Sequence, residues 1–136
     1  MLTSSEKRDH ILRMIAQIRQ MVDALTGRVR NGEDTAELLA QARESLAGLL
    51  GPMADVVQRL DSASAAQMVN DPGILFAWTQ VTAAESDAHR AAGDAASADA
   101  LARRALELAQ EAHQRALKDD PELQTLIDRL RAQIAS

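Results

Sequence analysis

Glutamate and histidine side chains at helical spacing are the first groups in this chain that could do chemistry. Glu85 and His89 stand four residues apart, so on a helix they would share one face and could hold a metal ion together. A carboxylate-bridged metal centre needs a second set of this kind, and His113 beside Glu111 does not supply it. We therefore expect Glu85 and His89 to lie on a polar helix face, and we expect no metal or other cofactor.

His89 also belongs to a segment that resembles the helix motif of histidine phosphotransfer domains, which are acidic four-helix modules of similar length: Ala88-His89-Arg90-Ala91-Ala92-Gly93. Those sites usually place a lysine three residues after the histidine, where this chain has Ala92. Gly93 favours a turn and leaves little helix beyond His89 to support a phosphohistidine. We favour an exposed helical histidine, and phosphotransfer by His89 is the alternative function that the sequence leaves open.

The other acidic residues form no general acid and base pair, because they are scattered about one per helical turn on faces that should be solvated. The chain has no cysteine, which excludes a thiolate nucleophile, a disulfide and a cysteine-bound zinc. It has no glycine-rich phosphate loop, and one tryptophan and one phenylalanine make no platform for nucleic-acid bases. The sequence therefore predicts a protein that is not an enzyme.

Charge and hydropathy bound the class of protein. With 136 residues, 46% hydrophobic and 26% charged, the chain fits a single helical domain over residues 1–136. Its net charge of -5 argues against nucleic-acid binding, which needs a basic stripe. No apolar run approaches the roughly 18 residues that span a bilayer, and Asp9 and Arg13 interrupt the stretch where a signal peptide would continue. We expect a soluble, cytoplasmic protein with no membrane or nucleic-acid partner.

The N-terminal region departs from this acidic average. Residues 1–30 carry a charge balance of +3, which leaves -8 for residues 31–136. Arg8, Arg13 and Gln17 lie in this basic region and are the candidate partner-binding residues. We favour their pairing with acidic side chains of the same helical bundle over contact with a ligand.

The elements that must position these residues are helices. The chain has 27 alanines and many Leu, Arg, Gln and Glu residues, whereas β-branched and aromatic residues are sparse. We predict a first hairpin over 1–50, short helices over 51–73, a second hairpin over 74–118 and a capping helix over 119–136. The first helix, about 4–30, has a continuous apolar stripe: Ile11, Ile15, Ile18, Val22, Leu25 and Val29.

Capping and turn residues predict where these helices begin and end. The predicted helix starts are marked by Thr3 with Glu6, Asp34, Ser64, and Asp120 with Pro121. The second hairpin is predicted as helices over about 74–92 and 96–118, which meet at a turn formed by Gly93 and Asp94.

An internal repeat relates the two hairpins. After a shift of 60 residues, Glu33, Asp34, Ala42, Arg43, Ser45 and Leu46 align with Gly93, Asp94, Ala102, Arg103, Ala105 and Leu106. The later copy resembles a tetratricopeptide repeat, because small residues and a turn glycine stand where such a repeat crosses its helices: Ser86, Gly93, Ala98 and Ala105. Two repeats are fewer than the three or so that a free-standing array needs, so other helices or a second subunit must close the domain.

A longer resemblance covers nearly the whole chain. Its opening motif, residues 8–17 (RDHILRMIAQ), is similar to that of a family of uncharacterised bacterial proteins with tetratricopeptide-like helices. Later features of the family recur in order: Leu49-Leu50-Gly51, Gly93-Asp94, Ala105-Leu106-Glu107-Leu108 and Pro121-Glu122. The chain departs from the family at His10, where an aromatic residue is usual, and at Ala16, where an acidic one is usual. The resemblance implies an all-helical fold and no established activity.

These patterns predict an all-α protein with two helical hairpins in a tetratricopeptide-like superhelix, short connecting helices and a C-terminal capping helix. The predicted function is a non-catalytic interaction or scaffold module. It would bind a protein or peptide in the groove between the hairpins or on the apolar face of the first helix. A homodimer is the first assembly to expect, because few bulky aromatics leave a thin core that a second copy would extend.

Overall fold

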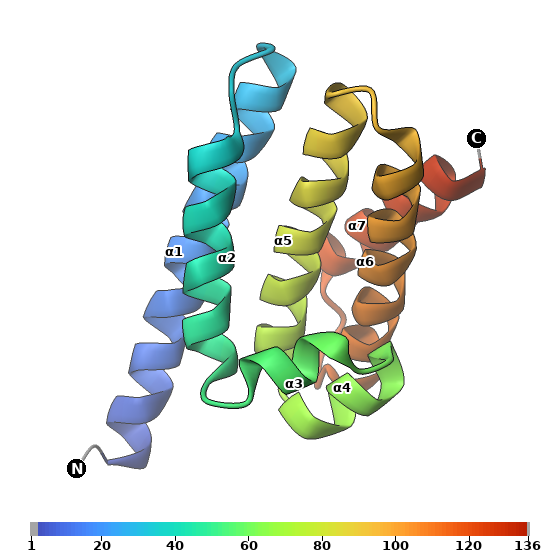
Figure 1. Ribbon diagram of the computed structural model, residues 1–136. Coiled ribbons are helices and arrows are strands. Elements are labelled where there is room, and N and C mark those ends of the chain that lie inside the picture. The colour runs from blue at the N-terminus through green and yellow to red at the C-terminus, as the bar shows by residue number, and fades with distance from the viewer. Residues whose placement is uncertain (1–2, 136) are drawn as a thin grey trace.

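The computed structural model describes residues 3–135 and folds them into seven helices (Figure 1). The helices are α1 (Ser4–Arg30), α2 (Ala36–Leu50), α3 (Ala54–Arg59), α4 (Ser62–Val69), α5 (Pro72–Ala91), α6 (Ala95–Arg115) and α7 (Pro121–Ala135). Between residues 3 and 135 there is no strand, which confirms the predicted all-α class. Within the same range, no helix combines the length and the hydropathy that crossing a bilayer requires.

The hairpin of α1 and α2 begins with the predicted capping box. The Thr3 hydroxyl accepts a hydrogen bond from the Glu6 backbone N–H at 3.1 Å, and the Glu6 carboxylate accepts one from the Thr3 N–H. Asp34 lies one residue before the N-cap of α2, and its carboxylate accepts from the Ala36 N–H at 3.0 Å. The hairpin contributes six buried residues to the main hydrophobic core: Ile18, Leu25, Leu39, Ala42, Leu46 and Leu49.

The short helices α3 and α4 connect the two hairpins at one end of the bundle (Figure 1). The prediction that Ser64 caps α4 is wrong, because the helix begins earlier and Asp61 is the cap. The Asp61 carboxylate accepts a hydrogen bond from the Ser64 N–H at 3.1 Å. Hydrogen bonds from the Ser64 hydroxyl and N–H lower the pKa of Asp61. Asn70 ends α4 in the left-handed region, with φ of 46°.

α5 begins two residues earlier than predicted. Asp71 is its N-cap, and one oxygen of the carboxylate accepts from the N–H groups of Gly73 and Ile74 at 2.9 and 3.1 Å. Pro72 takes the first position, where its missing N–H costs nothing. α5 packs against α1, α2, α4 and α6, so its buried residues lie on several faces: Leu75, Ala77, Trp78, Thr79, Val81, Thr82, Ala83, Ala84 and Ser86.

The hairpin of α5 and α6 is packed through small residues. Gly93 turns the chain with φ of 88°, and Asp94 caps α6 by accepting from the Ser97 N–H at 3.1 Å. Ser86 is fully buried, and its hydroxyl donates to the Ala98 carbonyl at 2.7 Å, which ties the two helices together. The buried face of α6 consists of Ala98, Ala102, Ala105, Leu108, Ala109 and Ala112. The helix ends at Arg115, three residues before the predicted end.

α7 packs on α6 and runs behind the second hairpin in Figure 1. As predicted, Asp120 precedes it as a cap, with its carboxylate accepting from the Glu122 and Leu123 N–H groups at 3.0 and 3.3 Å. Leu130 joins Ala83, Ala102 and Ala105 in a second hydrophobic cluster. This cluster holds α5, α6 and α7 together.

Candidate functional site

The three residues that the sequence offered as partner-binding candidates do not converge on one site. Arg8 extends from α1 to the start of α5, where its Nη1 lies 3.0 Å from Oδ2 of Asp71. Arg13 and Gln17 are exposed on α1, and their side chains make no hydrogen bond or ion pair with any described residue. Arg8 thus has the role within the bundle that we favoured, and none of the three lines the grooves described below.

His89 and Glu85 point to separate partners. Nδ1 of His89 lies 3.5 Å from Oδ2 of Asp94 across the turn between α5 and α6. Oε2 of Glu85 lies 2.8 Å from Nη2 of Arg43 on α2, so a cation already occupies that carboxylate. In the part of the chain that the structure describes, no group of three or more His, Asp or Glu side chains could hold a metal ion.

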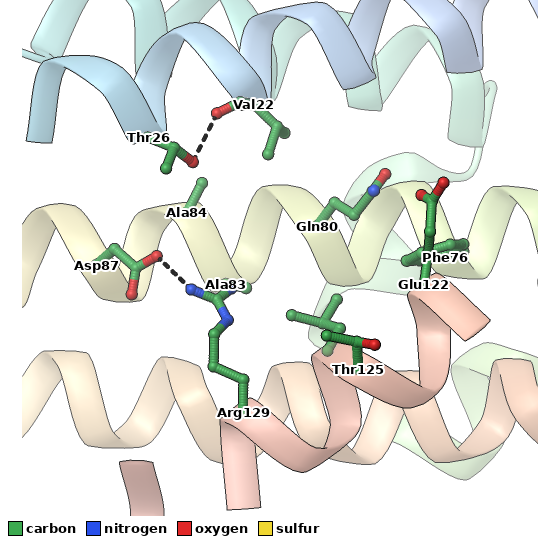
Figure 2. Close-up of a pocket in the computed structure, with 11 residues that line it drawn as sticks. Val22, Thr26, Phe76, Gln80, Ala83, Ala84, Asp87, Glu122, Thr125 and Arg129 are labelled. Atoms are coloured by element: carbon green, nitrogen blue, oxygen red, sulfur yellow. Dashed lines mark hydrogen bonds and ion pairs between the residues drawn. The ribbon is translucent and has the colours of Figure 1, made fainter. Parts of the chain in front are cut away.

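The main candidate site is a groove between α1, α5 and α7, which we call the α1–α5–α7 groove (Figure 2). Its volume is about 200 Å³. The apolar part of the lining consists of Val22, Phe76, Ala83, Ala84 and Leu126, and the polar part consists of Thr26, Gln80, Asp87, Glu122, Thr125 and Arg129. Figure 2 shows α5 as the central element, flanked by α1 and α7.

The floor of the groove follows from the spacing of residues on α5. Phe76, Gln80, Ala83 and Asp87 are separated by four, three and four residues, so they lie along one face of the helix. This face points between α1 and α7, and the small Ala83 and Ala84 leave room that larger side chains would fill. The half-buried Phe76 gives one end of the groove an aromatic wall.

The charged residues of the groove pair with each other or with the neighbouring α1. Nη1 of Arg129 lies 3.2 Å from Oδ2 of Asp87, and this carboxylate also accepts a hydrogen bond from Gln133. Glu122 forms an ion pair with Arg19, which links α7 to α1. Figure 2 shows Asp87 with Arg129 at one end of the groove and Glu122 near Phe76 at the other. The rim is therefore charge-balanced around an apolar centre.

The size of the groove favours an apolar side chain as its occupant. Sites for drug-sized molecules measure about 300–1,000 Å³, whereas an apolar cavity of about 150 Å³ accommodates one benzene molecule. A volume of about 200 Å³ thus fits one ring or one branched aliphatic side chain. Each acidic or basic side chain of the groove is already in an ion pair, so the arrangement suits docking better than proton transfer.

Apart from the groove, a polar cluster around Arg104 joins the short helices to α6. The Arg104 guanidinium lies over the Trp78 ring, with 5.0 Å between Cζ and the ring centroid, and its Nη1 donates to the Ser62 hydroxyl at 2.8 Å. The Ser62 hydroxyl donates to Oε1 of Glu107 at 2.8 Å. Burial lowers the pKa of Arg104, while the carboxylates of Glu107 and Asp61 oppose this change. The cluster pins α4 to α6 and has a structural role.

Sequence reasoning missed most residues of the groove and of this cluster. Arg104 could have been found, because it lies three residues after Leu101 and four before Leu108, at the edge of an apolar stripe. Phe76 carried no signal as a groove residue, since its partners on α1 and α7 are about 50 residues away in the chain.

Comparison of the chain with protein-family models, with curated proteins and with solved structures gave no match in any of the three.

Proposed function

We propose that this chain is a non-catalytic protein-interaction module, built from tetratricopeptide-like hairpins, that binds an amphipathic helix of a partner protein in the α1–α5–α7 groove. The observation that carries the proposal is an apolar groove floor, with Phe76 and Ala83, between two rims whose charges are paired within the chain. Such a site favours binding of an apolar anchor residue, and it has no unpaired charge to attract a strongly charged ligand.

The walls of the groove support a helix as the occupant. α1, α5 and α7 are three helices around one elongated hollow, and a fourth helix laid along it would complete a bundle. Ala83 and Ala84 are small, so they leave room on the floor of the groove for one anchor side chain of the docked helix. The partner would place a leucine or an aromatic ring in the groove and polar residues at its rim.

The proposal is tested by blocking the groove without disturbing the core. Thr125 lines the groove and is exposed, so Thr125→Trp should fill the groove while the chain folds normally. Gln124 is exposed on another flank of α7, and Gln124→Trp is the matched control. Amphipathic helical peptides are selected from a displayed library on the wild-type chain, and their Kd is then measured for both variants.

We expect Thr125→Trp to weaken the selected peptides by about tenfold or more, as loss of a buried anchor does, and Gln124→Trp to leave the Kd unchanged. Equal binding to both variants would contradict the proposal, as would a library that yields no peptide above background.

Phosphotransfer by His89 is a second candidate, favoured only by the partial exposure of the imidazole, 37% of the side chain. α5 ends two residues after His89, and Nδ1 faces Asp94, whose negative charge would repel a phosphoryl group. Incubation with phosphodonor kinases should therefore give no acid-labile phosphate on His89, and its appearance would replace the docking proposal with a signalling role.

A further inference from the structure

The end of the bundle where α2, α3, α4 and α5 meet carries a second hollow, which we call the end pocket. All of its lining side chains are apolar, among them Leu50, Met53, Met68 and Ile74, and its volume is about 220 Å³. Met53 and Met68 at its edge are about half exposed, at 49% and 50%. An apolar hollow with a flexible methionine rim is suited to take up an apolar side chain.

The chain itself presents such a side chain at the same end of the bundle. Leu117, in the connection between α6 and α7, is 99% exposed. Because α5 and α6 form a hairpin, α6 finishes at the end where α5 begins, and Ile74 in the first turn of α5 lines the end pocket. Figure 1 shows the end of α6 beside α3 and α4. Leu117 and the end pocket therefore lie at the same end of the molecule.

The chain exposes more surface than a compact monomer of its mass would. A compact monomer of 14.7 kDa is expected to expose about 6,900 Å² of surface. This chain exposes 8014 Å², an excess of about 1,100 Å² over that expectation. A standard protein interface buries about 800 Å² on each partner, so the excess is large enough for one.

We propose that the chain forms a two-fold dimer in which Leu117 of each copy enters the end pocket of the other. Leu117 and the end pocket lie at one end of the molecule, so each copy can insert its Leu117 into the pocket of the other, which gives a closed two-fold assembly. A pocket of about 220 Å³ is large enough for one leucine side chain. This inference concerns a different face from the α1–α5–α7 groove and does not depend on it.

Charged side chains of both signs stand near Leu117 and on α3. Lys118 and Asp119 follow Leu117, and Asp55 and Arg59 lie on α3, each two residues from Val57 of the end pocket. All four are exposed, and none forms an ion pair with a described residue. Leu117 and α3 thus each have one positive and one negative side chain nearby, which can pair with the opposite charges of the second copy.

Sedimentation equilibrium of the full chain tests the dimer. We expect a mass of twice 14.7 kDa for the wild type. Leu117→Asp should raise the dimer Kd by about thirtyfold or more, as loss of a central anchor does. Because Leu117 is fully exposed, this variant should keep its fold, which circular dichroism checks. Ala100→Asp adds the same charge at another exposed site and should leave the Kd unchanged. A monomeric wild type, or equal Kd values for the two variants, would overturn the proposal.

A cross-linking experiment tests which residues meet. The chain has no cysteine, so Leu117→Cys and Met68→Cys each introduce a unique thiol. We expect oxidation of a mixture of the two variants, one of them isotopically labelled, to join the thiol at position 117 of one copy to the thiol at position 68 of the other in a disulfide. Cross-links only between identical variants would show a different interface and overturn the exchange of Leu117.

Discussion

Replacing Ala102 by leucine tests whether α5, α6 and α7 are as closely packed as their alanines suggest. Ala102 is 0% exposed and belongs to the cluster with Ala83, Ala105 and Leu130. Leucine adds three carbon atoms at a position without free surface, and such overpacking costs about 1–3 kcal/mol. For a domain of this length, 1 kcal/mol corresponds to about 4 °C, so the melting temperature should fall by about 4–12 °C.

The matched control is Ala100→Leu, two residues earlier on α6 and exposed. Leucine and alanine have similar helix propensity, so this control should change the free energy of unfolding by no more than about 0.5 kcal/mol. Thermal and urea unfolding followed by circular dichroism measure both variants. If Ala102→Leu were as stable as Ala100→Leu, the helices would have room between them and the close-packing argument would be wrong.

Three further predictions concern helix ends and the buried serine. Asp71→Ala should lower the free energy of unfolding by about 1–2 kcal/mol in urea, because it removes the N-cap of α5 and its ion pair, whereas Asp71→Asn should cost less. Ser86→Ala should cost about 1 kcal/mol in the same assay, and a neutral result would contradict a stabilising hydrogen bond to α6. Hydrogen bonds from Ser64 and Ser97 lower the pKa of Asp61 and Asp94, respectively, below the usual 3.8. The contribution of these two carboxylates to the free energy of unfolding is therefore complete above pH 3.8 and is lost as the pH falls through the lowered pKa values. The melting temperature of the variant that combines Asp61→Asn and Asp94→Asn should therefore change less with pH, below about pH 4, than that of the wild type.

Much of the helical architecture could be predicted, because it depends on local signals. α1 has one apolar stripe and a capping box, and its predicted bounds match the structure. α7 likewise begins after Asp120 as its cap. The error at α4 arose because Asp61 and Ser64 are both good caps three residues apart, and short-range spacing does not choose between them.

The packing of α5 could not be predicted in the same way. The helix buries Trp78 and also Thr79 and Thr82, whose hydroxyls donate to the carbonyls one turn earlier. Because these hydrogen bonds are internal to the helix, the threonines can be buried although their sequence marks them as polar. A helix with neighbours on several sides therefore shows no single apolar face in its sequence.

The candidate sites were the least predictable part of the molecule, since they combine residues from distant helices. Arg8 was chosen for its charge, and the structure assigns that charge to the start of α5. The α1–α5–α7 groove joins Val22, Phe76 and Leu126, which no local pattern connects. Leu117 fell inside the helix predicted over 96–118, so its exposure in the connection after α6 was not predicted.

Site-specific photocross-linking at Gln80 tests the central proposal most directly. Gln80 lines the α1–α5–α7 groove, and Gln41 is exposed on α2, away from it. Because the chain has no cysteine, Gln80→Cys and Gln41→Cys each accept one photoreactive maleimide. With a helical peptide selected on the wild-type chain, we predict a cross-link at position 80 that excess unlabelled peptide abolishes, and none at position 41. Equal cross-linking at both positions would contradict docking in the groove.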